Sequence, residues 1–351
     1  MKKFLKIIAI IFTLILSLTL IFVLYIFISN KSFLESKNEI NVAYLGKNQA
    51  QITEEITEDL FDKDFYESKV FLFGESHGYA DNQKLDKQLF LFLNKKLAIK
   101  YYIAEVDSLT AKKLNNYLSN DIKSDSTLKD FVKAVKIRIP QQSSQELYNK
   151  WSELYDYNKN LPDSLKITVL GIDKNFDDYS KVSRDSAMAT NFNNSLKNLK
   201  IENEKFYGLF GFYHVLQNKV ELGGETFAAR LKKAGNKITS FVSYTIDSEM
   251  YLPKNPQFPT PPDEKIDLFN SDGPLVLVKG INDIKELSKP NTVTLFKINS
   301  QNSPYFKSQN LMNLKSRMDG QDIVPINGTH TTDYFQYVFL LRNSKALSKL
   351  K

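Results

Sequence analysis

VFLFGESHG, residues 70–78, is the most informative segment of the chain. It begins with an apolar run without polar alternation, which is typical of a strand buried on both faces of a parallel sheet. Two glycines within the segment allow a tight turn directly after the run. Ligands of open α/β sheets bind beyond the carboxyl ends of the strands, so Glu75, Ser76 and His77 lie where chemistry is expected.

The composition describes a globular protein with a mildly basic surface. The 351 residues are 42% hydrophobic and 25% charged, which is ordinary for a folded domain with a large core. The net charge is +7, but the lysines are interspersed with acidic residues, so we expect a solvated surface and no nucleic-acid partner. The absence of cysteine excludes disulfides, thiolate nucleophiles and cysteine-based zinc sites.

The N-terminus has the pattern of a membrane anchor. Three lysines precede an apolar run over residues 7–29. As a helix this run would be about 34 Å long, enough to cross the hydrocarbon core of a bilayer. It is longer than the apolar part of a cleaved signal peptide and lacks a small-x-small exit. The positive-inside rule then predicts a single-pass protein, held in the lipid bilayer by residues 7–29, with a cytoplasmic N-terminus and an extracytoplasmic domain.

Periodicity in the remaining chain predicts alternating strands and helices. We expect a linker over 31–50, a helix over 52–61, a strand over 69–75, a helix over 82–98 and a second strand over 101–106. The last three form a strand–helix–strand unit whose two strands would be parallel and adjacent. Further strands are expected at 166–172, 206–210, 237–244, 275–278, 292–296 and 334–341, and further helices at 183–196 and 227–233.

The predicted fold class is α/β, with a mostly parallel central sheet flanked by helices. Residues 1–30 would form the transmembrane anchor and residues 51–351 one α/β domain. Within that domain the helix-rich, polar residues 108–160 would form a cap over the sheet edge. Five prolines over 253–262 indicate an extended surface loop.

Polar side chains follow four of the predicted strands. They are Glu75 with His77, then Glu105, Asp173 and His214. Their convergence at one sheet edge would make a candidate site. A carboxylate two residues from an imidazole lies on the same face of a strand and fixes the tautomer of the ring.

Each of these residues also has a structural interpretation. His77 would be a turn histidine, His214 a core or helix-capping histidine, Glu105 a solvated carboxylate and Asp173 a turn cap. Arg184 would hold an anion or carboxylate, against the default of a surface arginine. The third histidine, His330, lies in a polar turn, and we place it outside the site.

Residues 74–78 also fit G-x-S-x-G, the nucleophile elbow of α/β-hydrolases. Ser76, Asp173 and His214 would meet the required order of nucleophile, acid and base. The elbow normally follows several strands and an oxyanion glycine motif, and neither precedes this segment. We therefore keep this as the minority interpretation.

Four segments together resemble the erythromycin esterase family and its wider superfamily, which includes haem-binding iron-regulated lipoprotein-like and membrane metalloprotease-like relatives. These segments are FGESHG at 73–78, YIAE at 102–105, RDSAMATN at 184–191 and GLFGFYH at 208–214. The chain has Glu-x-His where the macrolide esterases tend to have Glu-x-x-His. It also offers only lysines in the helix after His77, where those enzymes have an arginine. Both departures argue against a macrolide as the substrate.

The resemblance implies a hydrolase in which His77 is a general base that activates water. Glu75 and Glu105 would position the base, the water or the substrate, and His214 would act as acid, oxyanion partner or ligand holder. Arg184 belongs to the family's arginine-containing helix. We therefore predict a membrane-anchored hydrolase that acts on a small-molecule ester or lactone without a cofactor.

Two alternatives stay open at this stage. One is a haem- or metal-binding protein on the same fold. The other is a metal-dependent peptidase in which Glu75, His77, Glu105 and His214 form a mixed carboxylate–imidazole ligand set for a divalent metal.

Overall fold

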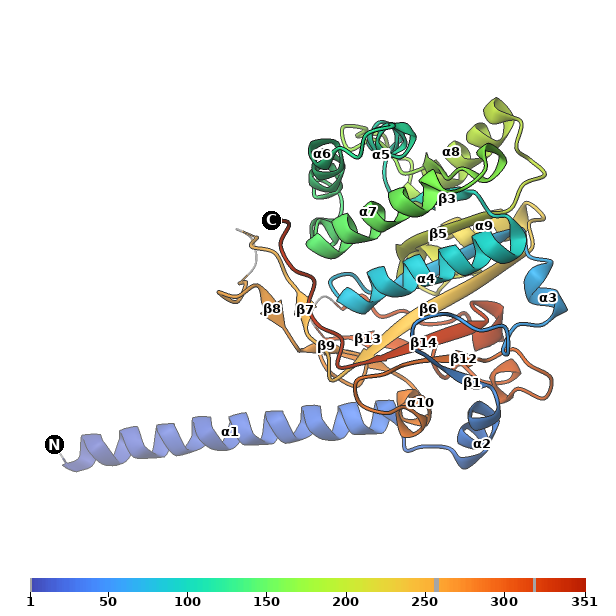
Figure 1. Ribbon diagram of the computed structural model, residues 1–351. Helices are drawn as coiled ribbons and strands as arrows, with labels where there is room; N and C mark the ends of the chain where they lie inside the picture. The colour runs from blue at the N-terminus through green and yellow to red at the C-terminus, as the bar shows by residue number, and fades with distance from the viewer. Residues whose placement is uncertain (1, 256–258, 318–319) are drawn as a thin grey trace.

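An eight-stranded sheet runs through the centre of the computed structural model, which describes residues 2–255, 259–317 and 320–351 (Figure 1). The strand order is β1-β12-β14-β6-β2-β5-β3-β4. The six strands from β14 to β4 are parallel, and β12 is antiparallel to both of its neighbours. The strands are β1 (Gln49–Ile52), β2 (Val70–Glu75), β3 (Tyr101–Ala104), β4 (Thr168–Gly171), β5 (Phe206–Gly211), β6 (Ile238–Ile246), β12 (Val293–Lys297) and β14 (Tyr337–Arg342). This is the mostly parallel α/β fold that the sequence predicts.

Helices cover both faces of the sheet, which explains the apolar run at the start of β2. Val70 and Leu72 belong to the core cluster that includes residues of α8 (Arg184–Leu199) and α9 (Phe227–Lys233). Phe71 and Phe73 belong to the cluster on the other face, with residues of α4 (Ala80–Leu97). All four side chains are fully buried, so β2 needs an apolar residue at every position rather than at alternate ones.

Residues 108–160 form helices between β3 and β4. They are α5 (Ser108–Ser119), α6 (Asp125–Val135), the 3₁₀ turn η1 (Pro140–Gln142) and α7 (Gln145–Lys159). Asp107, Ser124 and Ser144 each cap the following helix by accepting a backbone N–H bond, which satisfies a donor that the first turn would leave unpaired. In Figure 1 these helices gather beside α4, at the end of the sheet formed by β3 and β4.

A buried ion pair joins α7 to α4. The Lys150 ammonium donates to Asp86 Oδ2 at 2.6 Å, and the side chains of both residues are almost inaccessible to solvent. The same carboxylate accepts hydrogen bonds from the hydroxyls of Tyr102 and Tyr207. Because every charge in this network has a partner, the network fixes the position of α7, and therefore of the residues just before it, over the sheet.

Short strand pairs lie beyond the carboxyl ends of the central strands. They are β7 (Met250–Tyr251) with β8 (Lys265–Ile266), β9 (Phe269–Asn270) with β10 (Gly273–Pro274), and β11 (Val276–Val278) with β13 (Leu314–Ser316). The proline-rich segment 253–262 connects β7 to β8, and its residues 256–258 lie outside the described part of the chain. The remaining elements are α10 (Ile281–Leu287), η2 (Asp163–Leu165), η3 (Phe212–Val215), η4 (Pro304–Phe306) and η5 (Thr331–Asp333).

Residues 344–349, which follow β14, link the central domain to the helical insertion. Leu347 N–H donates to the carbonyl of Gly78, and Ala80 N–H donates to the carbonyl of Lys345. One residue after Leu347, the carbonyl of Ser348 accepts a bond from the N–H of Gln145, the first residue of α7. This segment therefore runs from the loop after β2 to the start of α7.

Two expectations for the region before β2 are wrong. The expected linker 31–50 contains the end of α1 (Lys2–Leu34), all of α2 (Glu39–Lys47) and the start of β1, and the side chain of Asn38 caps α2. The expected helix over 52–61 is instead the end of β1 followed by a loop, with α3 (Lys63–Tyr66) after it. Ile52 and Ile56 suggested a helical face, but both reach the core from extended backbone.

The expected adjacency of β2 and β3 is also wrong, because β5 lies between them and pairs with both. The absence of a side chain at Gly208 allows this close packing: a Cβ there would lie 2.3 Å from the carbonyl oxygen of Ile103 in β3. This strand order also affects the candidate site. Gly211, at the end of β5, now lies between the residues that follow β2 and those that follow β3.

The N-terminal helix α1 is long and apolar and projects from the domain (Figure 1). Its apolar side chains are exposed along the helix, and its length and composition suit either a membrane anchor or a signal sequence.

Candidate active site

His77 and Glu75 form the first carboxylate–imidazole pair of the site. The Nδ1–H group of His77 donates to Glu75 Oε1 at 2.9 Å, which leaves Nε2 as the basic nitrogen of the neutral ring. Gln142, from the helical insertion, donates to the same carboxylate oxygen at 2.5 Å. Glu75 is buried, and within the described residues its Oε2 atom has no hydrogen-bond partner. A buried carboxylate oxygen in this state suits a bound water or a polar group of a ligand.

Glu105 lies at the centre of the site. Its Oε2 atom accepts the backbone N–H of Gly211 at 2.6 Å, and its Oε1 atom accepts Arg184 Nη2 at 2.8 Å. A methyl group at Gly211 would lie 3.3 Å from His77 Nε2 and 3.7 Å from Glu105 Oε2. The basic nitrogen of His77 and the Glu105 carboxylate therefore face the same side of Gly211, in space that only a glycine leaves free.

His214 and Asp185 form a second carboxylate–imidazole pair with the same arrangement. His214 Nδ1–H donates to Asp185 Oδ1 at 2.7 Å, and its Nε2 atom lies 3.5 Å from Glu105 Oε1. Asp185 is held in place by the backbone N–H of Phe227, which donates to it at 2.6 Å. Both histidines are thus oriented by a carboxylate on Nδ1, and both direct Nε2 into the site.

Arg184 begins α8 and connects Glu105 to Asp173. Its Nε and Nη2 atoms bind the two oxygens of Asp173 at 3.2 and 2.5 Å, a bidentate arrangement that fixes the guanidinium plane. Arg138 approaches the same carboxylate at 3.4 Å. Because the carboxylates of Glu105 and Asp173 are buried, these arginines are needed to balance their charge.

The charges of the cluster determine the direction in which the pKa values of its histidines shift. Burial lowers the pKa of His77, but the hydrogen bond and charge of Glu75, together with the charge of Glu105, outweigh burial and leave the pKa above its ordinary value. Burial likewise lowers the pKa of His214, and Asp185 and Glu105 raise it by more. Burial raises the pKa of Glu105, yet the charges of His214, His77 and Arg184 leave it below its ordinary value. Four carboxylates face two guanidiniums here, so a proton on each histidine brings the cluster to neutrality.

A cavity of about 200 Å³ opens beside His77. Its polar side is formed by Ser76, His77 and Gln141. The apolar residues of its other wall come from the short strand pairs and are Met250, Phe269, Val276, Val278 and Leu314. A polar reactive centre next to a small apolar recess is the usual form of a ligand site.

The same residues do not form a metal site. Throughout the described residues 2–255, 259–317 and 320–351, no three His, Asp or Glu side chains are placed so that they could hold a metal ion. The expected ligand set of Glu75, His77, Glu105 and His214 is not assembled, because these groups bind one another, arginine or backbone N–H groups instead. The cavity is also smaller than the roughly 300–1,000 Å³ of pockets for drug-sized ligands, so a haem-sized group does not fit it.

The structure brings together all five residues that the sequence singled out: Glu75, His77, Glu105, Arg184 and His214. The fourth strand-end residue, Asp173, joins them through Arg184. His330 lies apart, half-exposed in a turn beside Asp333. The nucleophile-elbow interpretation does not match the contacts, since His214 is bound to Asp185 and Asp173 to arginine.

Three residues of the site were not identified from the sequence. Asp185, the partner of His214, directly follows the candidate residue Arg184, so its position in the sequence could have indicated a role in the site. Gln142 and Arg138 lie in the insertion, about 35 residues after Glu105, and no local pattern distinguishes them from other polar residues of these helices.

Comparison with known proteins identifies the fold. No protein-family model matches the chain, and no curated protein sequence matches it either. Among solved structures, a Bacillus cereus protein is similar with a TM-score of 0.63 and 10% identity, over 89% of this chain and 99% of that protein. A succinoglycan biosynthesis protein is similar with a TM-score of 0.57 and 12% identity, over 89% of this chain and 100% of that protein.

An erythromycin esterase mutant in its open conformation aligns over 83% of this chain and 95% of that protein, at 12% identity and a TM-score of 0.49. The two structures with TM-scores of 0.63 and 0.57 share their fold with this chain. At these identities the likeness is a distant relationship in architecture, and the chemistry has to be argued from the site itself.

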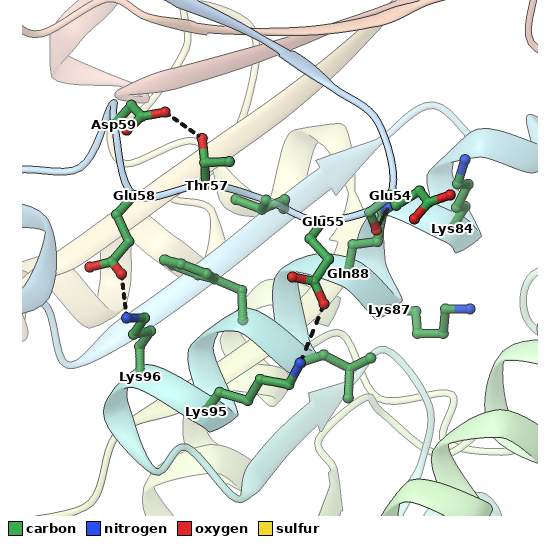
Figure 2. Close-up of a pocket in the computed structure, with 13 residues that line it drawn as sticks. Glu54, Glu55, Thr57, Glu58, Asp59, Lys84, Lys87, Gln88, Lys95 and Lys96 are labelled. Carbon is green, nitrogen blue, oxygen red and sulfur yellow. Dashed lines mark hydrogen bonds and ion pairs between the residues drawn. The ribbon is translucent and has the colours of Figure 1, made fainter.

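A larger cavity, of about 700 Å³, lies away from the histidines (Figure 2). It is formed between the loop 54–59 and the outer face of α4. Two of its lysines pair with glutamates across it: Lys95 lies 3.6 Å from Glu55, and Lys96 pairs with Glu58. No histidine lines this cavity, and its charges neutralise one another, so it does not compete with the site beside His77.

Proposed function

We propose that this protein is a membrane-anchored hydrolase that cleaves an ester bond with water activated by His77. The observation that carries the proposal is the pair of carboxylate-oriented histidines whose Nε2 atoms face Glu105 beside the cavity. The resemblance of these sequence segments to erythromycin esterases motivates the choice of an ester or lactone.

The first step is proton transfer from water to His77. With Nδ1–H bound to Glu75, the neutral ring accepts the water proton on Nε2, and the positive charge that develops is stabilised by Glu75. The resulting hydroxide attacks the carbonyl carbon and forms a tetrahedral intermediate. Glu105, fixed by Arg184 and Gly211, stabilises the protonated form of His77 and holds the attacking side of the site in one position.

The second step needs a donor for the negative oxygen and for the leaving group. His214 supplies it in its protonated form, which Asp185 and Glu105 stabilise and in which Nε2 carries a proton. That proton stabilises the oxyanion and then passes to the leaving alkoxide, while Asp185 holds the ring. The acyl group leaves as a carboxylic acid and loses its proton. Of this proton and the one on His77, one restores the protonated His214 and the other goes to solvent.

The anchor is the second part of the proposal. The apolar helix α1 would cross the bilayer with the three N-terminal lysines in the cytoplasm, which puts the domain outside. Protease protection of a C-terminal tag in sealed spheroplasts tests this orientation. Resistance of the tag to external protease would contradict it.

The test of the chemistry is hydrolysis of a panel of simple esters and lactones by the full chain in detergent. We expect His77→Ala to abolish hydrolysis, and we expect a chelator to change nothing. His330→Ala is the matched control, because this histidine is half-exposed and lies outside the site. Loss of activity in Ser76→Ala with retention in His77→Ala would overturn the mechanism in favour of a serine nucleophile.

A further inference from the structure

The cavity beside His77 and the end of the N-terminal helix share the same two strands. Val276 and Val278 of β11 and Leu314 of β13 line the cavity. Within two residues of these strands lie the contacts of α1: the amide of Asn30 donates to the carbonyl of Pro274. Arg317, which follows β13, donates to the side chains of Ser29 and Asn30. The strands that form part of the cavity wall therefore also bind the C-terminal end of α1.

With α1 across a bilayer, as proposed above, these contacts would place the cavity at the level of the lipid headgroups. The apolar run of α1 ends at Ser29, whose side chain accepts a hydrogen bond from Arg317 of the domain. Tyr25, one turn earlier, is exposed and has the interfacial position that tyrosines favour. Two residues of strand span about 7 Å, so Val276 lies within roughly that distance of Pro274, against which Asn30 rests. The headgroup region of one leaflet is itself about 5–8 Å deep.

The carboxyl edge of the sheet faces the same direction as the helix. In Figure 1, β7, β8 and β9, which follow the end of β6, lie on the side of the domain toward which α1 projects. The sheet edge that carries His77 and the cavity would thus face a bilayer crossed by α1.

The cavity itself suits an uncharged, apolar group. Aliphatic, aromatic and methionine side chains form most of its wall, and the uncharged polar residues are Ser76, Gln141 and Ser271. His77 is its one ionisable group besides tyrosine among the described lining residues. An apolar cavity of about 150 Å³ holds a benzene-sized molecule, so a cavity of about 200 Å³ holds only a short part of a lipid chain. The rest of a long-chain substrate would remain outside it.

From these observations we infer that the substrate is a bilayer amphiphile with an ester at headgroup level. Its apolar segment next to the ester enters the cavity, its carbonyl reaches His77, and its remaining chain stays in the membrane. This inference rests on the proposed function and specifies the substrate class of the same site.

The experiment compares two insertions in the full chain, reconstituted in phosphatidylcholine vesicles. A ten-residue Gly-Ser segment between Ile28 and Ser29 keeps the docked end of the helix but separates the domain from the bilayer by about 17 Å on average. The same segment between Lys3 and Phe4 is the matched control, because it leaves the distance between domain and bilayer unchanged. Each protein is assayed on a fluorogenic ester lipid in the vesicles and on soluble p-nitrophenyl acetate.

We expect the insertion after Ile28 to lower hydrolysis of the vesicle ester at least tenfold, with hydrolysis of the acetate unchanged and the control insertion without effect. Val276→Phe, which fills the cavity wall, should likewise lower hydrolysis of the vesicle ester more than that of the acetate. Equal rates on the vesicle ester for both insertions, or hydrolysis of the acetate alone, would overturn the inference and leave the hydrolase standing. No hydrolysis of either ester by the unmodified chain would overturn the proposed function, and this inference with it.

Discussion

Gly211→Ala separates the activity of the site from the stability of the fold. The added methyl group would lie 3.3 Å from His77 Nε2, in the space that faces Glu105. A water activated by His77 has to sit about 2.6–3.2 Å from that nitrogen, so the methyl group displaces or shifts it. A misplacement of about 1 Å costs on the order of a hundredfold in rate, or about 2.7 kcal/mol in activation free energy.

The same substitution should leave the free energy of unfolding nearly unchanged. The backbone at Gly211 has φ −58° and ψ 145°, which alanine adopts without strain. The loss of unfolded-state entropy favours the variant by about 0.4–1 kcal/mol, which offsets a contact slightly tighter than ideal. Gly224→Ala is the matched control, because a methyl group there meets nothing within 4 Å.

The assay is kcat/KM on whichever ester the unmodified chain hydrolyses, with urea unfolding of each variant. We expect kcat/KM to fall about a hundredfold in Gly211→Ala, with the urea midpoint retained. An unchanged kcat/KM in a stable variant would show that the reacting water does not occupy the space beside Nε2. A large loss of stability would refute the claim that this space is free.

Four further predictions concern other contacts of the site and the core. Hydrolysis should rise with pH through a value above about 6.5, because His77 must lose its proton to act as the base and its pKa is raised. Glu75→Gln removes the largest influence that raises the pKa of His77, so the acidic limb of the pH–rate profile should move to lower pH. By the same linkage, the protonated ring stabilises the fold below about 6.5 and this contribution is lost as the pH rises through the folded pKa, so the pH dependence of the urea midpoint should weaken in Glu75→Gln. Lys150→Met should lower the free energy of unfolding by about 3–5 kcal/mol, since it leaves the buried Asp86 carboxylate without its cation, and an unchanged urea midpoint would contradict this. Gly78→Ala should be destabilised by about 1–3 kcal/mol, because the residue has φ +99° and a methyl group would lie 2.8 Å from a carbonyl oxygen; a melting temperature equal to that of the unmodified chain would refute it.

The parts of the fold that the sequence predicts well are those in which local pattern and burial agree. The apolar run of β2 is covered on both faces, so its composition has one explanation. The polar residues that follow it had to lie at the carboxyl edge of the sheet, which is why Glu75 and His77 could be named. The same reasoning placed Glu105 and His214.

The remaining parts depend on contacts between distant segments. The order of β2, β5 and β3 is set by how closely backbones approach at Gly208, and no periodicity encodes that. Gln142 reaches Glu75 from an insertion whose position is fixed by the buried pair of Lys150 and Asp86. Such residues look like ordinary polar residues of a helical region until the tertiary structure is known.

The segment 344–349 ties the order of synthesis to the assembly of the site. It binds the loop after β2 through Gly78 and the start of α7 through Gln145, more than 195 residues earlier in the chain. A chain emerging from a ribosome or through a translocation channel therefore has β2 and the insertion available long before the segment that joins them. The hydrogen bonds of this segment add to the buried pair of Lys150 and Asp86, which also holds the insertion beside α4. The hydrogen bonds between residues 344–349 and the two earlier segments can therefore form only after β2 and the insertion have been synthesised.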